Sequence, residues 1–196
     1  MDWSGKAFLN ESEVVRRAHL GDQAAWELVM QLHQEPVFRF AYLLVGDPLE
    51  AEDLAQETFI RAFRAFDSFD DQRALRPWLL SITANLARNR RRSLSRYLAA
   101  LTRLFHSGSR ETENIEERSA RNEENLEVWQ GIQQLPETDQ QVIYLRYFLE
   151  LSVREVSEAA GIAPGTVKSR LHRSLKRLRD VLERDLPEYG KEWKDG

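Results

Sequence analysis

Residues 151–179 read LSVREVSEAAGIAPGTVKSRLHRSLKRLR, and this stretch decides the fold that the chain is expected to adopt. Ser152, with Glu155 three positions later, forms a capping box that begins a short helix, and Gly161 is expected to end it. Pro164 suits the first residue of a second helix, because that position needs no backbone N–H. Two helices joined by a tight turn that contains glycine predict a helix-turn-helix.

The second helix of this pair is amphipathic and basic. Its apolar residues recur at steps of three or four and define one face: Val167, Leu171, Leu175, Leu178 and Leu182. The positions from Gly161 to Arg179 contain six Lys and Arg residues and no Asp or Glu. A basic second helix of this kind is suited to the major groove of duplex DNA. The alternative is an ordinary helical hairpin with a solvated basic face.

Charge is distributed unevenly along the 196 residues, although the net charge is only −4. Residues 61–110 carry 11 Lys and Arg against 3 Asp and Glu, and residues 161–196 carry 9 against 6. The segments 1–60 and 111–160 are both acidic. Two basic segments separated by acidic ones predict two separate contacts with nucleic acid.

The composition disfavours several classes of protein. The chain has no Cys, which excludes disulfides and thiolate zinc sites, and its four His show no metal-ligand spacing. No apolar run approaches about 18 residues and no signal-peptide pattern opens the chain, so a cytoplasmic protein without membrane insertion is expected. Because no nucleophile–base pair, carboxylate cluster or phosphate loop is found, we expect neither a cofactor nor an enzyme such as a recombinase.

Helical periodicity also runs through the N-terminal part of the chain. A short helix through His19 is expected, then a second one capped by Asp22, and another that begins at Pro36 and is closed by Gly46. The apolar residues of these segments, such as Trp26, Met30 and Phe38, are most simply core.

A further start signal follows at Asp47-Pro48, where Asp can cap a helix whose first residue is Pro. The core-facing residues of this helix are spaced at helical intervals: Ala51, Leu54, Ala55, Thr58, Phe59, Ala62 and Phe66. Its other side carries acids and amides, which are either solvated surface or a polar interface for a basic partner.

Pro77 begins a strong helix, PWLLSITANLARNRRR, with two distinct faces. Leu79, Ile82 and Leu86 form the apolar one. The other is formed by Trp78, Ser81, Asn85, Arg88 and Arg92, with Asn89 beside it. Aromatic rings stack on bases, amides bond base edges and arginines follow phosphates, so this face suits single-stranded nucleic acid. The alternative places Trp78 in the core and the arginines in solvent.

The expected fold is all-α, with two helical domains joined by a flexible linker and the helix-turn-helix in the second domain. The first domain is expected over residues 1–92, the linker over 93–124, the second domain over 125–186 and a tail over 187–196. The linker is inferred from the acidic run ETENIEERSARNEEN, which is poor in large apolar residues.

Three stretches in this order carry a resemblance to a known family: GDPLEAEDLAQETFIRAFRAFDSF, RPWLLSITANLARNRRR and LPETDQQVIYLRYFLELSVREVSEAAGIAPGTVKSRLHRSLKRLR. The chain resembles sigma-70-type RNA polymerase initiation factors of the extracytoplasmic-function (ECF) group, over roughly residues 12–92 and 123–182. The helix-turn-helix alone is weakly specific, whereas the ordered combination with a linker of this length is highly specific.

The resemblance implies a sigma factor that directs core RNA polymerase to promoters. The −35 element would be read as duplex DNA by Thr166, Lys168, Ser169, Arg170, His172 and Arg173. The melted −10 strand would be captured by Ser68, Phe69, Asp70, Arg73, Trp78, Asn85, Arg88, Asn89 and Arg92. The β′ clamp helices of polymerase would be bound by Asp53, Gln56, Glu57 and Ile60.

The same resemblance implies further partners. These are the β flap of polymerase and an anti-sigma factor, and the linker would run into the active-site cleft and RNA exit path. The competing hypothesis is a stand-alone helix-turn-helix regulator of duplex DNA. It accounts for residues 151–179 but not for the face from Trp78 to Arg92 or for the acidic helix at 50–64.

Overall fold

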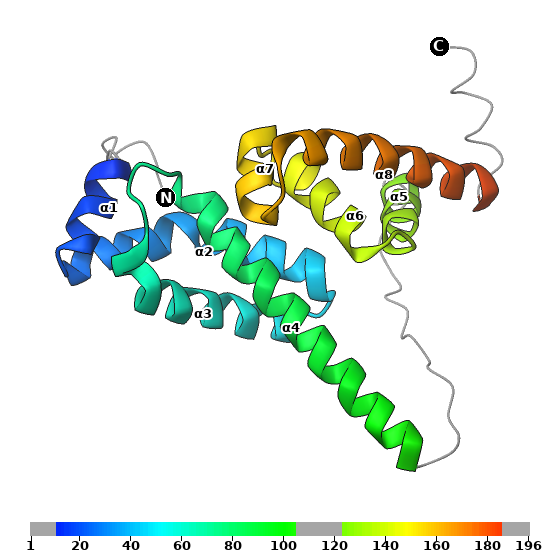
Figure 1. Cartoon of the computed structure of the whole chain (residues 1–196), viewed down its shortest axis with the longest axis horizontal. Helices are drawn as coiled ribbons and strands as arrows, with labels where there is room; N and C mark the ends of the chain where they lie inside the picture. The colour runs from blue at the N-terminus through cyan, green and yellow to red at the C-terminus, as the bar shows by residue number, and fades with distance from the viewer. Residues whose placement is uncertain (1–10, 105–122, 186–196) are drawn as a thin grey trace. The chain divides into compact units, whose positions relative to one another are not determined.

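The computed structural model describes residues 11–104 and 123–185, and these are helical, with no strand among them (Figure 1). The first described range contains α1 (Glu11–His19), α2 (Gln23–Val45), α3 (Pro48–Ala65), the 3-10 turn η1 (Phe66–Ser68) and α4 (Leu75–Leu104). The second contains α5 (Glu123–Gln133), α6 (Glu137–Ile143), the π-helical turn η2 (Tyr144–Phe148), α7 (Val153–Ala160) and α8 (Pro164–Asp185). The prediction of an all-α chain is therefore confirmed.

Two compact units are distinguished by their internal packing. One takes residues 1–89 with 154–161, and the other takes 90–153 with 162–196. The predicted domain boundaries at 92 and 125 stay predictions. Helix α4 continues to Leu104, so the first part of the predicted linker is helical, whereas residues 105–122 and the predicted tail lie outside the described residues.

The predicted helix boundaries around α2 and α3 are confirmed by their caps. The side chain of Asp22 accepts hydrogen bonds from the backbone N–H groups of Ala24 and Ala25, at 3.0 and 3.2 Å. Gly46 ends α2 in the left-handed region, with φ of 79°, a conformation that Gly adopts without steric penalty. Asp47 caps α3 by accepting from the backbone N–H three residues later, at 2.8 Å.

The prediction that a new helix begins at Pro36 is wrong, because α2 is continuous from Gln23 to Val45. Pro removes one backbone hydrogen bond from a helix and crowds the preceding turn. Here Val29, His33 and Val37 are all buried and continue one stripe across the proline. Burial of that stripe stabilises the uninterrupted helix, as tertiary packing usually does for long helices.

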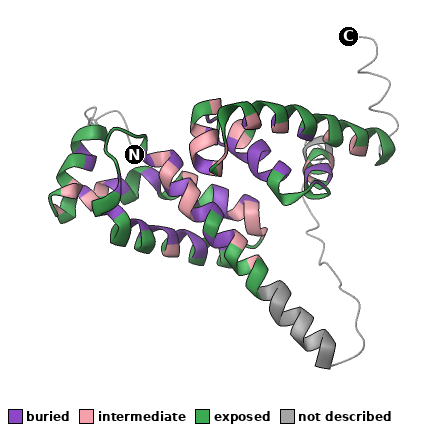
Figure 2. Cartoon of the chain, in the orientation of Figure 1, coloured by how far each residue is buried: buried purple, intermediate pink, exposed green. Residues whose placement is uncertain are grey.

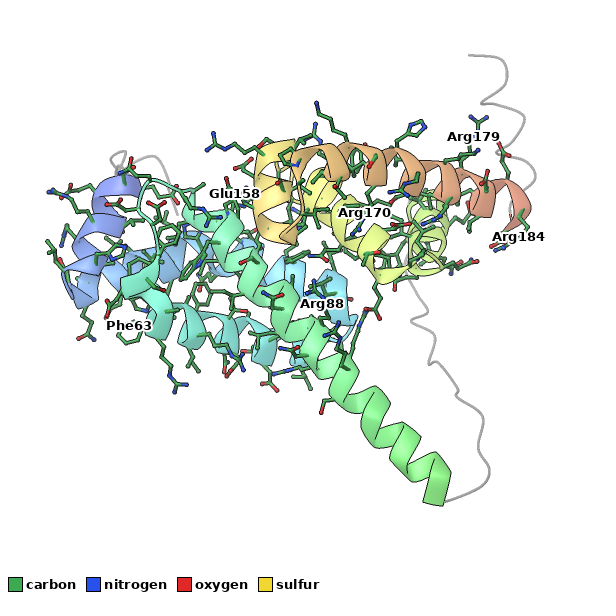
Figure 3. The ribbon with its side chains drawn as sticks, in the orientation of Figure 1. Phe63, Arg88, Glu158, Arg170, Arg179 and Arg184 are labelled. Carbon is green, nitrogen blue, oxygen red and sulfur yellow. The ribbon has the colours of Figure 1, made fainter. Side chains whose placement is uncertain are left out.

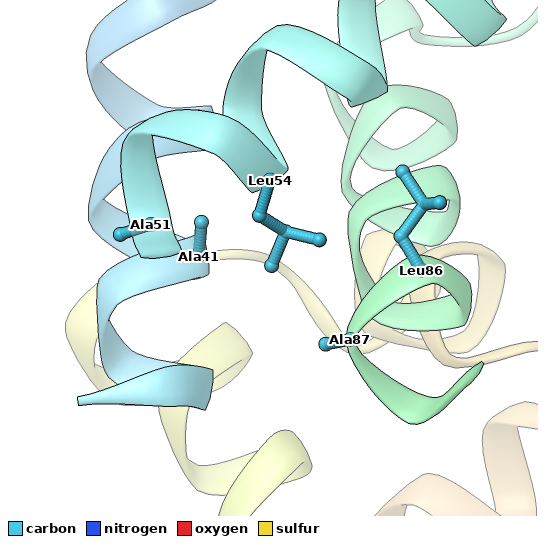
Figure 4. Packing of buried hydrophobic residues seen from close by; sticks show 5 residues of the cluster. All are labelled: Ala41, Ala51, Leu54, Leu86 and Ala87. Atoms are coloured by element: carbon cyan, nitrogen blue, oxygen red, sulfur yellow. The ribbon is translucent and has the colours of Figure 1, made fainter. Parts of the chain in front are cut away.

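A cluster of small and branched apolar residues joins α2, α3 and α4 (Figure 4). It consists of Ala41, Ala51, Leu54, Leu86 and Ala87. Three of the five are Ala, which lets the helix backbones approach closely while the two Leu side chains fill the space between them. In Figure 2 the buried residues follow the facing sides of these helices. The predicted apolar stripe of α3, from Ala51 to Phe66, is buried throughout.

An aromatic cluster anchors the segment between α3 and α4. Phe66 stacks on His19 with ring centroids 4.6 Å apart and meets Trp26 edge-on at 4.9 Å. Phe69 packs against Trp78 at 4.7 Å. These rings tie the start of the loop to α1, α2 and α4, so the loop leaves the core from a fixed point.

Helices α5, α6 and α8 pack on one another in the C-terminal part. Tyr144 is buried in the π-helical turn, where its hydroxyl accepts a hydrogen bond from Gln133 Nε2 at 2.8 Å. Burial raises the pKa of Tyr144, so its ring stays neutral at ordinary pH. On the predicted apolar face of α8, Val167 and Leu171 are buried, whereas Leu175 is 40% exposed.

Candidate nucleic-acid and protein interfaces

The N-terminal half of α8 carries the residues predicted to read duplex DNA. Helix α7 ends at Ala160, Gly161 follows it with a φ of 67°, and α8 begins at Pro164, as predicted for the helix-turn-helix. Four of the six predicted side chains are exposed and two are half-buried: Lys168, Ser169, His172 and Arg173, then Thr166 and Arg170. Val167 and Leu171 lie on the buried side. The structure therefore brings the predicted residues together on the first three turns of one helix.

Two of these side chains are held against the helix by its own carbonyl groups. Ser169 Oγ donates to the backbone oxygen of Thr166 at 3.1 Å, and Arg173 Nε donates to that of Ser169 at 3.2 Å. Both bonds point toward the N-terminus of α8, as helical side chains do. The guanidinium of Arg173 is thus placed over the turn that carries Ser169.

The cations farther along α8 differ in their surroundings. Arg177 pairs with Asp139 of α6, whose side chain is only 6% exposed. Arg179 pairs with Glu183 one turn later, at 2.8 Å on the surface, and it is labelled toward the C-terminal end of α8 in Figure 3. The sequence pattern grouped all six cations of the helix together, because charge and spacing do not reveal a partner on another helix.

The face of α4 that was predicted to bind single-stranded nucleic acid is accessible over part of its length. Asn85, Asn89 and Arg92 are exposed, and Arg88 is half-buried. Arg88 Nη1 donates to Asn85 Oδ1 at 3.1 Å, which leaves the amide nitrogen of Asn85 as its outward donor. Trp78 is half-buried in the aromatic cluster, the packing that the alternative interpretation of this face expected.

The loop that contains Ser68, Phe69, Asp70 and Arg73, which were predicted to help capture the melted strand, is built on a buried anchor. Phe69 is buried among Phe66 and Trp78, so its ring packs the core, whereas Ser68, Asp70 and Arg73 are exposed. The Asp70 side chain accepts from the backbone N–H of Gln72 at 3.0 Å, and its backbone oxygen accepts from that of Arg73 at 3.0 Å. These bonds form a tight turn just beyond the anchor.

The residues predicted to bind polymerase lie on the outer side of α3. Asp53, Gln56 and Ile60 are exposed, and Glu57 is half-buried. Glu57 pairs with Arg61 one turn later, with the carboxylate and Arg61 Nε 2.7 Å apart. A surface pair of this kind contributes little to stability.

An open groove of about 1290 Å³ lies beside these residues, between α2 and α3. Gln56 and Ile60 line it, together with apolar side chains that were not predicted to form a site: Trp26, Met30, Phe38 and Phe63. Phe63 is 62% exposed and lies on the outside of α3 (Figure 3). Met30 and Phe38 are also exposed, so the prediction that they belong to the core is wrong.

A pattern in the sequence of α2 indicates this groove. Trp26, Met30 and Phe38 recur at steps of four and eight, which places them in one row along α2. That row runs beside the buried row of Val29, His33 and Val37, so α2 presents a wider apolar surface than its core requires.

Residues 11–104 and 123–185 contain no group of three or more His, Asp or Glu side chains arranged to hold a metal ion. Among the described helices, none combines the length and the apolar character that crossing a membrane requires.

Comparison with known families covers both parts of the chain. Residues 29–97 match the family model for Sigma-70 region 2, and residues 125–178 match that for Sigma-70, region 4. The chain is also 34% identical over 180 residues to the ECF RNA polymerase sigma factor SigW of Bacillus subtilis, covering 88% of this chain and 96% of that protein. The chain belongs to the ECF sigma factors. Members of this family are transcription initiation factors that bind core RNA polymerase and promoter DNA.

Other relatives agree with this assignment. This ECF sigma factor is 33% identical to the RNA polymerase sigma-H factor of Pseudomonas aeruginosa, over 88% of this chain and 94% of that one. Among solved structures, it matches the sigma factor RpoE in complex with the anti-sigma factor NepR from Bartonella quintana with a TM-score of 0.64 and 25% identity, over 80% of this chain and 96% of that one. CnrH in complex with the cytosolic domain of CnrY matches in fold, with a TM-score of 0.67, 23% identity, and coverage of 89% and 98%.

Proposed function

We propose that this ECF sigma factor divides its work among three surfaces. Core polymerase is held by α3 and the groove between α2 and α3. The melted −10 strand is captured by the exposed side of α4 and the loop at 68–73. The −35 duplex is read by the first three turns of α8.

The α3 surface is the observation that carries the proposal. Asp53, Gln56 and Ile60 are exposed beside an open apolar groove, a combination that suits a protein partner with both basic and apolar side chains. A regulator that acts on duplex DNA without polymerase has no need of such a surface. We assign it to the β′ clamp helices.

Two further surfaces are suited to bind different forms of DNA. The amides of Asn85 and Asn89 alternate along α4 with Arg88 and Arg92, and amide and guanidinium groups can read the edges of unpaired bases. On α8, Lys168 and Arg173 are exposed and Arg170 is half-buried, while Val167 and Leu171 are buried, and a major-groove helix likewise has one polar side and one packed side.

Partners beyond polymerase and DNA follow from the relatives. The structure of RpoE was determined in complex with an anti-sigma factor, so we propose that an anti-sigma factor also restrains this protein. We also propose that this sigma factor acts in the cytoplasm. We further propose that the C-terminal helices bind the β flap.

The polymerase assignment is tested by capture of purified core polymerase on the immobilised full-length protein. Charge reversal with Asp53→Lys and Glu57→Lys, and separately Phe63→Glu, should each weaken capture strongly. Leu49→Glu is the matched control, because Leu49 lies on α3, is 74% exposed and does not line the groove. Thermal unfolding of each variant establishes that it is folded.

The outcomes separate the alternatives. Capture that survives the double charge reversal means that α3 is not the polymerase surface. Capture that survives Phe63→Glu alone restricts the interface to the polar side of α3. Failure of the wild-type protein to bind core polymerase, with sequence-specific duplex binding retained, would support a stand-alone regulator.

A further inference from the structure

Asp139 is an acidic side chain in an unusual environment. It lies in the first turn of α6 and is 4% exposed, within a segment where the next four residues are also buried. Removing a carboxylate from water is strongly unfavourable unless a cation and hydrogen bonds compensate it. The compensating group is Arg177 of α8, whose Nη1 donates to Asp139 Oδ2.

Arg177 occupies a particular position on α8. Successive residues of a helix are separated by about 100° around its axis. Thr166, Arg170, Arg173 and Arg177 follow one another at steps of four, three and four, so they form a single row along the helix. The first three members of that row are residues proposed to read DNA. The fourth is held by another helix.

The ion pair with Asp139 therefore holds the last residue of the row whose first three residues are proposed to face DNA. A rotation of α8 by about 20° would move side-chain groups at a radius of about 6 Å by about 2 Å. Hydrogen bonds to base edges tolerate only a few tenths of an ångström in length. A contact that fixes the rotation of α8 thus controls whether the groups of Arg170 and Arg173 reach their targets.

We propose that Asp139 and Arg177 are positioning residues that set the rotation of the recognition helix. Neither contacts DNA. Asp139 holds Arg177 against α6, and this fixes the direction in which Thr166, Arg170 and Arg173 point. The inference rests on the proposed role of α8 in reading the −35 duplex.

The obvious alternative is that Arg177 is one more phosphate contact. The two roles predict different dependence on salt and on sequence. Loss of a phosphate contact weakens binding to all sequences alike and reduces the slope of affinity against salt by about 1. Loss of positioning weakens binding to the correct sequence more than to others, because base contacts are the ones that need exact placement.

The experiment is a double-mutant cycle on the full-length protein assembled with core polymerase. The variants are Asp139→Asn, Arg177→Gln and both together, with Arg177→Lys as the conservative variant. The control is Arg179→Gln, since Arg179 forms an exposed ion pair with Glu183 of the same helix. The probes are a duplex recovered by the wild-type holoenzyme from a random-sequence pool and the same duplex with its bases shuffled. Binding is measured at a temperature at which thermal unfolding shows every variant to be folded.

We expect each single variant to lower the ratio of the two affinities by about tenfold, the size of one lost base contact. The double variant should be no worse than either single one, because both remove the same contact. Arg177→Lys should recover most of the ratio, and Arg179→Gln should keep it.

Three results would overturn the inference. Arg177 would be a phosphate contact if Arg177→Gln weakened binding to both duplexes equally and reduced the slope of affinity against salt, while Asp139→Asn had no effect on binding. An unchanged ratio in all variants would mean that the pair stabilises the fold alone. If the wild-type holoenzyme recovers no upstream sequence, the proposed role of α8 is itself wrong and the inference falls with it.

Discussion

Thr58 and Thr83 face each other across the interface of α3 and α4, with their Oγ1 atoms 3.2 Å apart and both side chains fully buried. Each hydroxyl also lies within hydrogen-bond distance of its own helix, at the carbonyl oxygens of Leu54 and Leu79, 2.8 and 3.1 Å away. The two hydroxyl groups have only two protons for these three short contacts, so not all three can be hydrogen bonds at the same time. The pair is a polar contact inside the core, between the two helices that carry the proposed polymerase and −10 surfaces.

Replacing one member of this pair by Val should lower the free energy of unfolding by about 1 kcal/mol, the usual size of one buried hydrogen bond. The double variant Thr58→Val with Thr83→Val should lower it by less than the sum, because both partners are then apolar and similar in shape. Urea denaturation of the four proteins measures this coupling. Strict additivity would show that the two hydroxyls do not interact.

Gly131 of α5 leaves little room for a larger side chain. A Cβ at this position would lie 3.0 Å from Leu178 Cδ1 and 3.0 Å from Leu182 Cδ2 of α8. Gly131→Val should therefore lower the free energy of unfolding by about 1–3 kcal/mol, as overpacking of a core does. Gly165→Ala is the matched control, because nothing lies within 4 Å of a Cβ there, and it should be neutral or slightly stabilising. Chemical denaturation compares the two, and equal stability of both variants would contradict the packing argument.

Acid should weaken the attachment of α1 to α2. Glu11 Oε1 lies 3.3 Å from Nε2 of buried His33, and this interaction holds the pKa of Glu11 below its ordinary value of 4.5 against the opposing effect of burial. A carboxyl group with a lowered pKa stabilises the folded state above the unfolded pKa and loses that effect as the pH falls through the folded pKa. The free energy of unfolding should fall more steeply with acid, below about pH 5, in the wild type than in Glu11→Gln.

The control for this prediction is Glu13→Gln, since Glu13 pairs only with exposed Arg16 on the same helix. Its acid profile should resemble that of the wild type. Parallel profiles for the wild type and Glu11→Gln would contradict the proposed contribution of the pair.

Arg173→Ala should weaken binding to the −35 duplex. Its guanidinium is held over the turn of Ser169, where it can reach either a base edge or a phosphate. A lost bidentate base contact would weaken binding by about 1–3 kcal/mol and relax specificity at one position. Competition binding with a panel of single-base variants of the upstream duplex measures both effects, and unchanged affinity would remove Arg173 from the interface.

Asn85→Ala should impair capture of the melted strand without affecting attachment to polymerase. The outward amide of Asn85 is the group proposed to bond an unpaired base, and Asn85 does not line the groove that is assigned to polymerase. Permanganate reactivity of unpaired thymines measures opening, and capture of core polymerase measures attachment. Normal opening would remove Asn85 from the proposed strand contact.

The helix boundaries were predictable because their causes are local. An Asp cap, a Pro at the first position and a Gly in the left-handed region act within four residues, and the structure agrees with them at Asp22, Asp47, Gly46 and Gly161. Pro36 was mispredicted because its effect depends on whether the residues on both sides bury the same stripe. That property belongs to the packing of α2 and not to the local sequence.

The sites were predictable only to the level of a helix face. The family resemblance assigned the −35 residues to the N-terminal half of α8, and the charge pattern counted Arg177 among the cations of that helix without revealing that a carboxylate 38 positions earlier in the chain holds it. Likewise, periodicity assigned Phe38 to the core because it is apolar, whereas the groove leaves it exposed. Both features depend on packing between helices that are remote in sequence, which local patterns cannot encode.

Helix α4 has a mechanical consequence. It is continuous from Leu75 to Leu104, a length of about 45 Å at 1.5 Å per residue. Its first half is fixed in the core through Leu79, Leu80 and Leu86, and the same half carries the proposed strand contacts. A continuous helix of this kind behaves as a lever without a hinge. A force that a partner applies near Leu104 would be transmitted along the helix to Asn85 and Arg88. Binding of a partner at that end would therefore shift the residues that are proposed to hold the melted DNA strand.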